Sequence, residues 1–366
     1  KIIDYIDYND LFYLLYKIVQ FESSSTERRK HIFETPLKDI LKNTSTKTKI
    51  YIRDFATGPG LGLDWNTASF GHLAVVVGFS FNSISKWKVM RMPTNEAWIN
   101  PWVNYLKSKG VKFNYGYSLK YLDINDNSYI DEIILEKGND LLNVKANEYI
   151  IAIDPFSYRT VLNNTLKEAG KYKKYLKQQI NILDKMNTVN NQIGFVIGFN
   201  KEFQYQNTGD CFVLVDSPNN ITFYPQDLHF CNNINLGNNI KSLWSGTCVI
   251  SYNKGILYGK SLTNLKIDEL KSEIIEQILK SKDLEWYIAQ NNNNHKLVQN
   301  DIEIIEIFED WYYEEDKLHT KNLKWVNTYF NEKYRLEQNT PINNLYIAGS
   351  HTKTTINVWS MEGAVE

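Results

Sequence analysis

The feature that most limits the fold is a short apolar run near the C-terminus that ends in glycine. Residues 345–348 have the length and composition of a buried strand, Gly349 follows directly, and a polar loop leads to a helix start near Ser360. Glycine at a strand end lets another backbone or a ligand approach closely. Ligands of open α/β sheets bind at the carboxyl ends of strands, and the free amides that open a helix attract anionic groups. The pattern therefore predicts an α/β protein with a ligand site at this strand end.

A second apolar run, residues 149–153, ends at Asp154 and Pro155. An unbroken apolar run of this length between turn signals predicts a central parallel strand that is buried on both faces. Residues 156–186 predict a helical stretch with a break near Gly170. Residues 149–153 are therefore expected to be a buried strand that leads into a helix.

The segment before that strand predicts a helix followed by a hairpin. Residues 94–109 have helical spacing, and Gly110 suits the position just after the helix. Pro101 falls inside this segment and implies either a kink or a later helix start near Asn100. After the helix the apolar period changes to two, which predicts strands over residues 111–115, 119–124 and 130–135.

The rest of the chain divides into a helical part and a β-rich part. Apolar residues recur at helical spacing over residues 10–21 and 68–77. Short β-type runs between residues 193 and 252 are typical of an antiparallel sheet that faces a cavity. Residues 270–281 predict an amphipathic helix with one buried side.

A glycine-rich segment, residues 57–63, invites a phosphate-loop interpretation. Its glycines run G-x-G-x-G and not G-x-G-x-x-G, no buried strand precedes them, and Pro59 lacks an amide that a phosphate would need. A turn between helices is the better interpretation.

The composition narrows the classes of function. The chain has 366 residues and a formal net charge of -1, so it offers no electrostatic footprint for nucleic acid. No stretch approaches the roughly 20 apolar residues of a transmembrane segment. Its three cysteines lack metal-site spacing and are expected to be reduced thiols of a cytoplasmic protein, and we expect no metal site. The 24 tyrosines and 9 tryptophans suit either a deep core or a large apolar cavity.

The C-terminal stretch resembles a flavin-binding motif. Ala348 and Gly349, followed by Trp359-Ser360-Met361-Glu362-Gly363-Ala364, resemble the motif of the flavin amine oxidase, phytoene desaturase and protoporphyrinogen oxidase superfamily. The resemblance implies that the helix amides meet the pyrimidine edge of FAD and that residues 348–350 lie along its ribityl and pyrophosphate portion. Ser350 stands where the family has an acidic residue, which puts one cofactor contact in doubt.

Two upstream segments fit the same superfamily. Residues 93–122 resemble its stretch before the adenine-contacting strand, which would place Leu119 at the adenine, and residues 150–155 resemble a strand that passes near FAD. The resemblance thus implies a set of cofactor-binding residues: Leu119, Asp154, Ala348, Gly349, Ser350, Trp359, Ser360, Met361 and Glu362.

The superfamily normally begins with a strand and a G-x-G-x-x-G turn, and this sequence contains neither. An N-terminal truncation is the favoured interpretation, with a true loss of FAD binding as the other. The resemblance implies a Rossmann-like FAD domain, without its first strand and glycine-rich turn, interleaved with an α+β substrate domain that contains an antiparallel sheet. Residues 94–161 and 335–366 are assigned to the FAD domain, and residues 1–93 and 162–334 to the substrate domain.

The implied function is that of an FAD-dependent oxidoreductase that removes a hydride from a small apolar substrate, such as an isoprenoid or an amine. The alternatives are a flavin-dependent isomerase, a degenerate scaffold without flavin, and a plain binding protein for a hydrophobic ligand. No catalytic base is evident. His351 is interpreted as a loop residue near the cofactor, with proton carrier as the alternative, and His72 as a packing residue.

Overall fold

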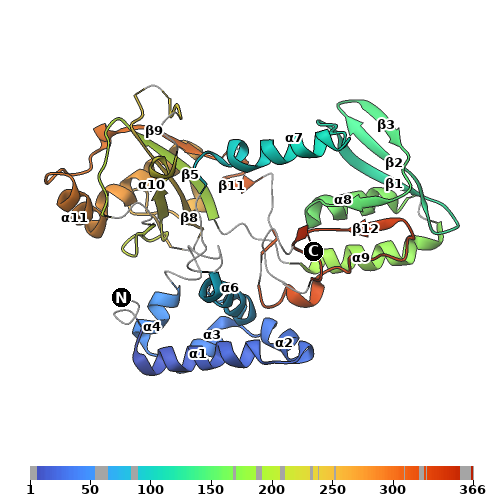
Figure 1. Cartoon of the computed structure of the whole chain (residues 1–366), viewed down its shortest axis with the longest axis horizontal. Helices are drawn as coiled ribbons and strands as arrows, with labels where there is room; N and C mark the ends of the chain where they lie inside the picture. The colour runs from blue at the N-terminus through green and yellow to red at the C-terminus, as the bar shows by residue number, and fades with distance from the viewer. Residues whose placement is uncertain are drawn as a thin grey trace.

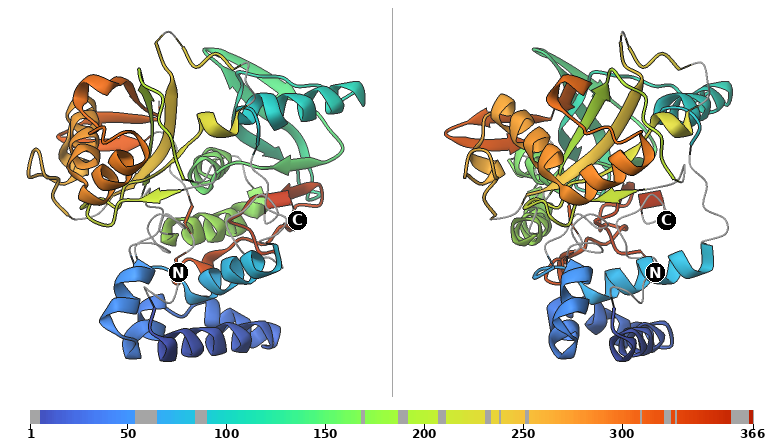
Figure 2. Two further views of the ribbon diagram at one scale, coloured as in Figure 1. Left: turned by 60° about the vertical axis from the view of Figure 1, so that its left-hand side comes forward. Right: turned by 90° about the vertical axis from the view of Figure 1, so that its left-hand side faces the viewer.

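The computed structural model shows a mixed α/β molecule (Figure 1). Its described residues form three hydrophobic cores. The structure describes residues 6–53, 65–83, 90–167, 170–186, 192–206, 211–230, 234–237, 239–250, 253–308, 310–320, 325–326, 328–354 and 364–365. The N-terminal helices lie at one end of the molecule and the larger antiparallel sheet at the other, with α8, α9 and β12 between these levels (Figure 2). The glycine-rich segment, residues 57–63, lies outside the described residues.

The N-terminal core is entirely helical. Its helices are α1 (Tyr8–Glu22), α2 (Thr26–Phe33), α3 (Leu37–Ile40), α4 (Thr46–Tyr51) and α6 (Phe70–Ser83). Serine caps begin two of them: Ser25 accepts a hydrogen bond from an amide of α2, and Ser45 does the same for α4. Phe21, Phe33 and Leu37 are among the buried residues where these helices meet. The expected helical part is therefore confirmed in the described residues.

The helix that follows resolves the question raised by Pro101. A π-helical turn, η5 (Asn95–Ile99), runs directly into the regular helix α7 (Asn100–Ser108), because Ile99 and Asn100 both have helical backbone angles. Pro101 therefore lies inside a continuous helical segment, next to the π-helical turn, where its missing amide interrupts the regular hydrogen-bond pattern. Gly110 follows with φ +90°, as expected after a helix end. The strand predicted over residues 111–115 was wrong, because this segment has no strand partner and the chain turns at Gly116 before pairing begins.

A three-stranded meander then forms from β1 (Ser118–Ile124), β2 (Ile130–Lys137) and β3 (Asp140–Val144). It is followed by β4 (Tyr149–Ile151), α8 (Pro155–Thr165) and α9 (Lys173–Lys185), with Gly170 at φ +50° in the predicted break. The amide of Leu122 in β1 donates to Thr165 of α8 at 3.0 Å, which fixes the meander against the helix. All of these elements except β3 contribute residues to the second core.

The two apolar runs, residues 149–153 and 345–348, form strands that pair with each other. β4 and β12 (Leu345–Ile347) are parallel, with Ile150 opposite Tyr346. Burial on both faces was wrong for the described residues: Tyr149 and Ile151 are buried, but Ile150 is 69% exposed and Tyr346 39%. The reason lies in the tertiary structure. The helices α8 and α9 contribute to the core on one face of the β4–β12 pair only, and the described residues leave the other face uncovered.

The predicted antiparallel sheet is confirmed. It has the order β6-β7-β8-β5-β9, with all neighbours antiparallel. Its strands are β5 (Gln192–Phe199), β6 (Phe212–Val213), β7 (Thr222–Pro225), β8 (Ser242–Val249) and β9 (Ile302–Ile307). The helices α10 (Ile267–Lys280) and α11 (Lys282–Asn291) contribute to its core, and a small hairpin, β10 (Trp311–Glu314) and β11 (Lys317–Thr320), follows β9.

Candidate functional site

The carboxyl ends of β4 and β12 meet at one edge because the two strands are parallel. The amide of Ala348 donates to the carbonyl of Ile151 at 3.0 Å, so the ladder continues one residue beyond β12. Gly349 follows with φ +142°, a conformation that side chains other than glycine's rarely adopt. Of the predicted cofactor-binding residues, the structure brings Asp154, Ala348, Gly349 and Ser350 to this edge.

Asp154 has a structural task at the edge. As the N-cap of α8, it accepts hydrogen bonds from the amides of Phe156 at 2.9 Å and Ser157 at 3.0 Å, and from the Ser157 hydroxyl. Its carboxylate is therefore engaged by the helix start, and it contributes negative charge to the edge.

His351 is the most unusual side chain of this region. It is only 3% exposed, and its Nε2 has no hydrogen-bond partner among the described residues. Burial and the nearby Arg335 guanidinium lower the pKa of His351 to about 4, against a raising effect of Asp154. The ring is therefore neutral near pH 7. A buried polar atom without a partner is rare in proteins, and it indicates a place where a ligand or water completes the bonding.

The His351 ring also explains why residue 349 is glycine. A Cβ at Gly349 would lie 2.7 Å from His351 Cε1 and 2.8 Å from its Nδ1. That separation is shorter than a van der Waals contact, so any larger residue would push the ring away. The glycine and the imidazole form one unit.

Arg335 holds the loop after β12 in place. Its Nη1 donates to the carbonyl of Ser350 at 2.7 Å and to that of Thr352 at 3.1 Å, and its guanidinium carbon lies 4.3 Å from the centre of the Trp325 ring. The carbonyl of Gly349 accepts from the amide and the hydroxyl of Thr352. Each of these three carbonyls is therefore engaged by a donor within the loop or beneath it.

A buried carboxylate connects this loop with the helical part of the chain. Glu332 Oε2 accepts from Arg335 Nε at 2.9 Å and lies 3.2 Å from His72 Nε2 of α6. Burial acts to raise the pKa of Glu332, but the hydrogen bond with His72 and the charge of Arg335 outweigh it and hold the pKa below its usual value. His72 is buried, as its packing interpretation implied, but it is also part of an ionic network.

Reasoning from the sequence missed Glu332 and Arg335. They lie in a segment without a motif, and the available signal was an arginine in a chain that mostly uses lysine for positive charge. Arginine is the cation that proteins favour for buried, multiply bonded sites. Nothing in the local pattern told which carbonyls it would bind.

The remaining predicted site residues fall into two groups. Leu119 lies in β1, in a different sheet from β4 and β12, and is half-buried against the second core. Trp359, Ser360, Met361 and Glu362 lie outside the described residues, although Ala364 and Val365 just beyond them are helical. Their contacts with a cofactor stay predictions.

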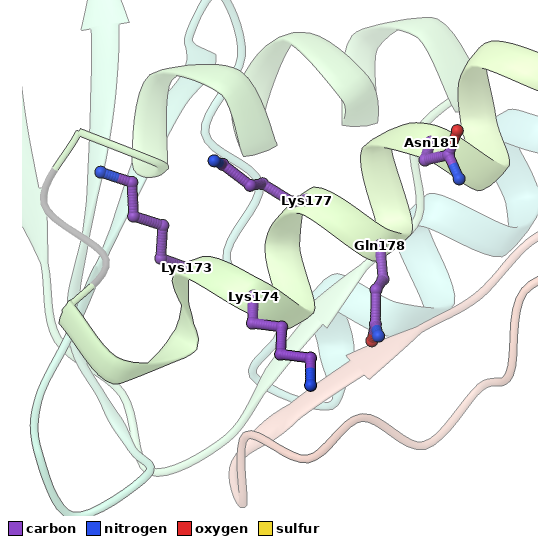
Figure 3. A pocket seen from close by; sticks show the side chains of 5 residues that line it. All are labelled: Lys173, Lys174, Lys177, Gln178 and Asn181. Carbon is purple, nitrogen blue, oxygen red and sulfur yellow. The ribbon is translucent and has the colours of Figure 1, made fainter.

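Other candidate sites are weaker. A surface hollow of ≈ 520 Å³ is lined by exposed side chains of α9, which spread in different directions from the helix (Figure 3): Lys173, Lys174, Lys177, Gln178 and Asn181. None of the predicted cofactor-binding residues lines it. Within the described part of the chain, no three His, Cys, Asp or Glu residues are grouped to hold a metal ion.

Comparisons with known proteins show what fold this is. The chain is similar to an oxidoreductase from Methanosarcina mazei, with a TM-score of 0.59 and 12% identity over 98% of this chain and 71% of that one. It is also similar to a double mutant of putrescine oxidase made to redesign cofactor binding, with a TM-score of 0.54 and 10% identity over 94% and 70% of the two chains. No protein-family model and no curated protein matches the sequence. The chain therefore shares its fold with an oxidoreductase and with putrescine oxidase.

Proposed function

We propose that this protein is an FAD-dependent oxidoreductase whose cofactor lies against the loop that follows β12. The observation that carries the proposal is a buried His351 ring that packs against Gly349 and whose Nε2 has no hydrogen-bond partner among the described residues. The fold shared with the two solved structures supports it, as does the resemblance of the last residues to a flavin-binding motif.

The residues at this edge fit an anionic, planar cofactor. Because Arg335 and Thr352 engage the loop carbonyls, those oxygens do not face a cofactor phosphate as unpaired acceptors. A neutral imidazole with its proton on Nε2 donates a hydrogen bond without adding a charge. The backbone of Gly349 and Ser350 would lie along the ribityl and pyrophosphate portion of the cofactor. His351 would donate a hydrogen bond to the cofactor.

Asp154 is assigned a positioning role in this proposal. Its carboxylate caps α8 and keeps that helix start in place beside the cofactor site, and its negative charge moderates the field of Arg335 at His351. The four residues from Trp359 to Glu362 would open the final helix toward the pyrimidine edge, as the resemblance implies.

Bound FAD would supply the redox chemistry by accepting a hydride from a substrate C–H bond. This chain would position the substrate and exclude water, and no residue is assigned as a base. The proposed substrate is a small apolar molecule, such as an isoprenoid or an amine, because aromatic residues are abundant in the chain.

The first experiment measures flavin in the protein expressed from its complete gene. Bound flavin is expected to show in the visible absorbance of the purified protein and to bleach when an apolar C–H substrate is added without oxygen. Flavin that binds but shows no net reduction would favour the isomerase. Protein that folds without flavin would favour the scaffold and would end the proposal.

A pair of glycine variants tests the location. Gly349→Ala is expected to lower flavin content because the new methyl displaces His351. Gly138→Ala is the matched control, since Gly138 also has a positive φ of +62° but meets nothing within 4 Å. Equal flavin content in both variants would place the cofactor elsewhere.

A further inference from the structure

A tight hairpin at residues 254–261 presents apolar side chains at its tip. Lys254 pairs with Ser261, and the amide of Gly255 donates to the carbonyl of Lys260 at 2.8 Å. The tip between them is Ile256, Leu257, Tyr258 and Gly259, and its three apolar side chains are 47%, 47% and 38% exposed in that order. Turn tips are usually built from glycine, proline and small polar residues, so three large apolar residues here are unexpected.

The tip is held from below by a buried carboxylate. Glu273 of α10 is 0% exposed and accepts hydrogen bonds from three successive amides, those of Ile256 at 2.7 Å, Leu257 at 3.0 Å and Tyr258 at 3.1 Å. A Cβ at Gly255 would lie 2.2 Å from the carboxyl carbon of Glu273, so only glycine permits this approach. The hairpin is therefore fixed to the core of the β-rich part.

The same carboxylate belongs to a larger buried network. Gln277 Nε2 donates to Glu273 at 2.8 Å and to Asn219 Oδ1 at 2.8 Å, and the Ser217 hydroxyl donates to Gln277 at 2.6 Å. Asn253, at the base of the hairpin, donates to the carbonyl of Pro218 at 2.8 Å. The hairpin is thus joined to the turn at residues 217–220 as one rigid unit.

This arrangement directs the tip amides inward and the apolar side chains outward. Moving an amide without a hydrogen-bond partner from water into an apolar medium is strongly unfavourable. The three tip amides already have one in Glu273, so moving the tip out of water leaves none of them unpaired. The apolar side chains gain from the same transfer.

Lysines flank the tip on both sides. Lys254 and Lys260 are exposed, and neither forms an ion pair with any residue that the structure describes. Lysine side chains extend their ammonium groups toward polar lipid headgroups while their stems lie along apolar surface. Each lysine near an anionic bilayer surface contributes attraction of its own.

We propose that this hairpin is a contact with a lipid bilayer that carries anionic headgroups, with Ile256, Leu257 and Tyr258 inserted at the interface and the two lysines among the headgroups. The hydrogen-bonded tip amides, the apolar side chains and the two flanking lysines suit a bilayer better than a protein partner. A protein partner would bring hydrogen-bond donors and acceptors of its own. The contact is peripheral: none of the described helices has the length and apolar character needed to cross a bilayer. It does not depend on the flavin proposal.

The test is co-sedimentation of the full protein with lipid vesicles. Vesicles of phosphatidylcholine with added phosphatidylserine are expected to bind the protein, and those of phosphatidylcholine alone to bind it less. The double variant Ile256→Ser and Leu257→Ser is expected to bind roughly tenfold more weakly, because two half-exposed apolar side chains are removed. Lys254→Gln with Lys260→Gln is expected to abolish the preference for anionic vesicles, and added salt should have the same effect.

The matched control is Leu141→Ser with Leu142→Ser, which removes two exposed leucines from β3. This control should bind as the unaltered protein does. Since all four apolar positions are exposed, the thermal unfolding temperature should change little in either double variant, which separates lost binding from lost folding. Unaltered protein that ignores both kinds of vesicle, or equal losses in the hairpin and β3 variants, would overturn the proposal.

Discussion

Two buried glutamates organise two regions of this molecule in different ways. Glu332 lies beside the loop that follows β12 and is bonded by charged or chargeable side chains, Arg335 and His72. Glu273 lies beneath the hairpin tip and is bonded by three backbone amides and the Gln277 side chain. One network joins elements that are distant in sequence, while the other fixes a turn against the helix that follows it.

The difference shows what each kind of partner can do. A long side chain such as arginine can span between segments, so the Glu332 network connects α6 with the β12 loop across 263 positions of sequence. Backbone amides cannot extend away from the chain, so the Glu273 carboxylate has to approach them closely. The absence of a side chain at Gly255 leaves the space for that approach. An ionic network is also costly to break on one side only, because the remaining charge stays buried.

The largest expected effect comes from removing the cation of the first network. Arg335→Met leaves Glu332 buried without its arginine partner and removes the donor to the carbonyls of Ser350 and Thr352, so the free energy of unfolding should fall by about 3–5 kcal/mol. Chemical denaturation measures this directly. Lys271→Met is the control, since the Lys271–Glu306 pair is partly exposed and should contribute below about 1 kcal/mol. Similar losses of unfolding free energy in both variants would show that the buried network contributes no more to stability than a surface ion pair does.

The next effect is a pH dependence of the same region. The pKa of His351 is about 4 in the folded protein against its usual 6.5, so between these values the unfolded chain binds a proton that the folded one does not. Stability should therefore fall as pH drops from 6.5 to 4, by about 3 kcal/mol for this group.

The variant His351→Phe isolates that contribution. In this variant the free energy of unfolding should change less between pH 6.5 and pH 4 than it does in the unaltered protein. The flavin-free variant should also be slightly more stable near pH 7, because a buried polar atom without a partner among the described residues is removed. Flavin content should fall at the same time. Gained stability with unchanged flavin content would mean that His351 faces no cofactor.

The smallest of the three effects concerns the second network. Glu273→Gln keeps one oxygen but turns an NH2 group toward amides that are themselves donors, so the free energy of unfolding should fall by about 2 kcal/mol. Hydrogen exchange should accelerate at the amides of Ile256, Leu257 and Tyr258, and not at those of β4. Unchanged exchange at the tip would show that the carboxylate does not hold the hairpin.

Much of the fold could be predicted from local pattern. The strands β4 and β12, the hairpin of β1 and β2, the antiparallel sheet and the helix α10 follow from apolar period and turn residues, and the structure confirms them. The strand predicted over residues 111–115 failed because alternation alone does not supply a partner strand. The prediction that Ile150 is buried was wrong for a similar reason, since composition does not show which elements cover each face of a sheet.

The candidate site divides in the same manner. Gly349 and its neighbours stood out because a glycine after an apolar run is a local signal. Arg335, Glu332 and the ionic role of His72 were not accessible, because their partners are backbone carbonyls and side chains from distant segments. The same holds for Glu273, which as a residue of an amphipathic helix gave no sign of the hairpin it binds.

The sequence by itself indicated most of the strands and helices, the glycine that follows β12, and the apolar residues that stand between two lysines at residues 254–260. Only the tertiary structure decided which polar atoms were left without partners and which carboxylates were taken out of water. The physical reason is that backbone conformation depends on near neighbours in the chain, whereas burial and the strength of a charge depend on whatever the fold brings alongside.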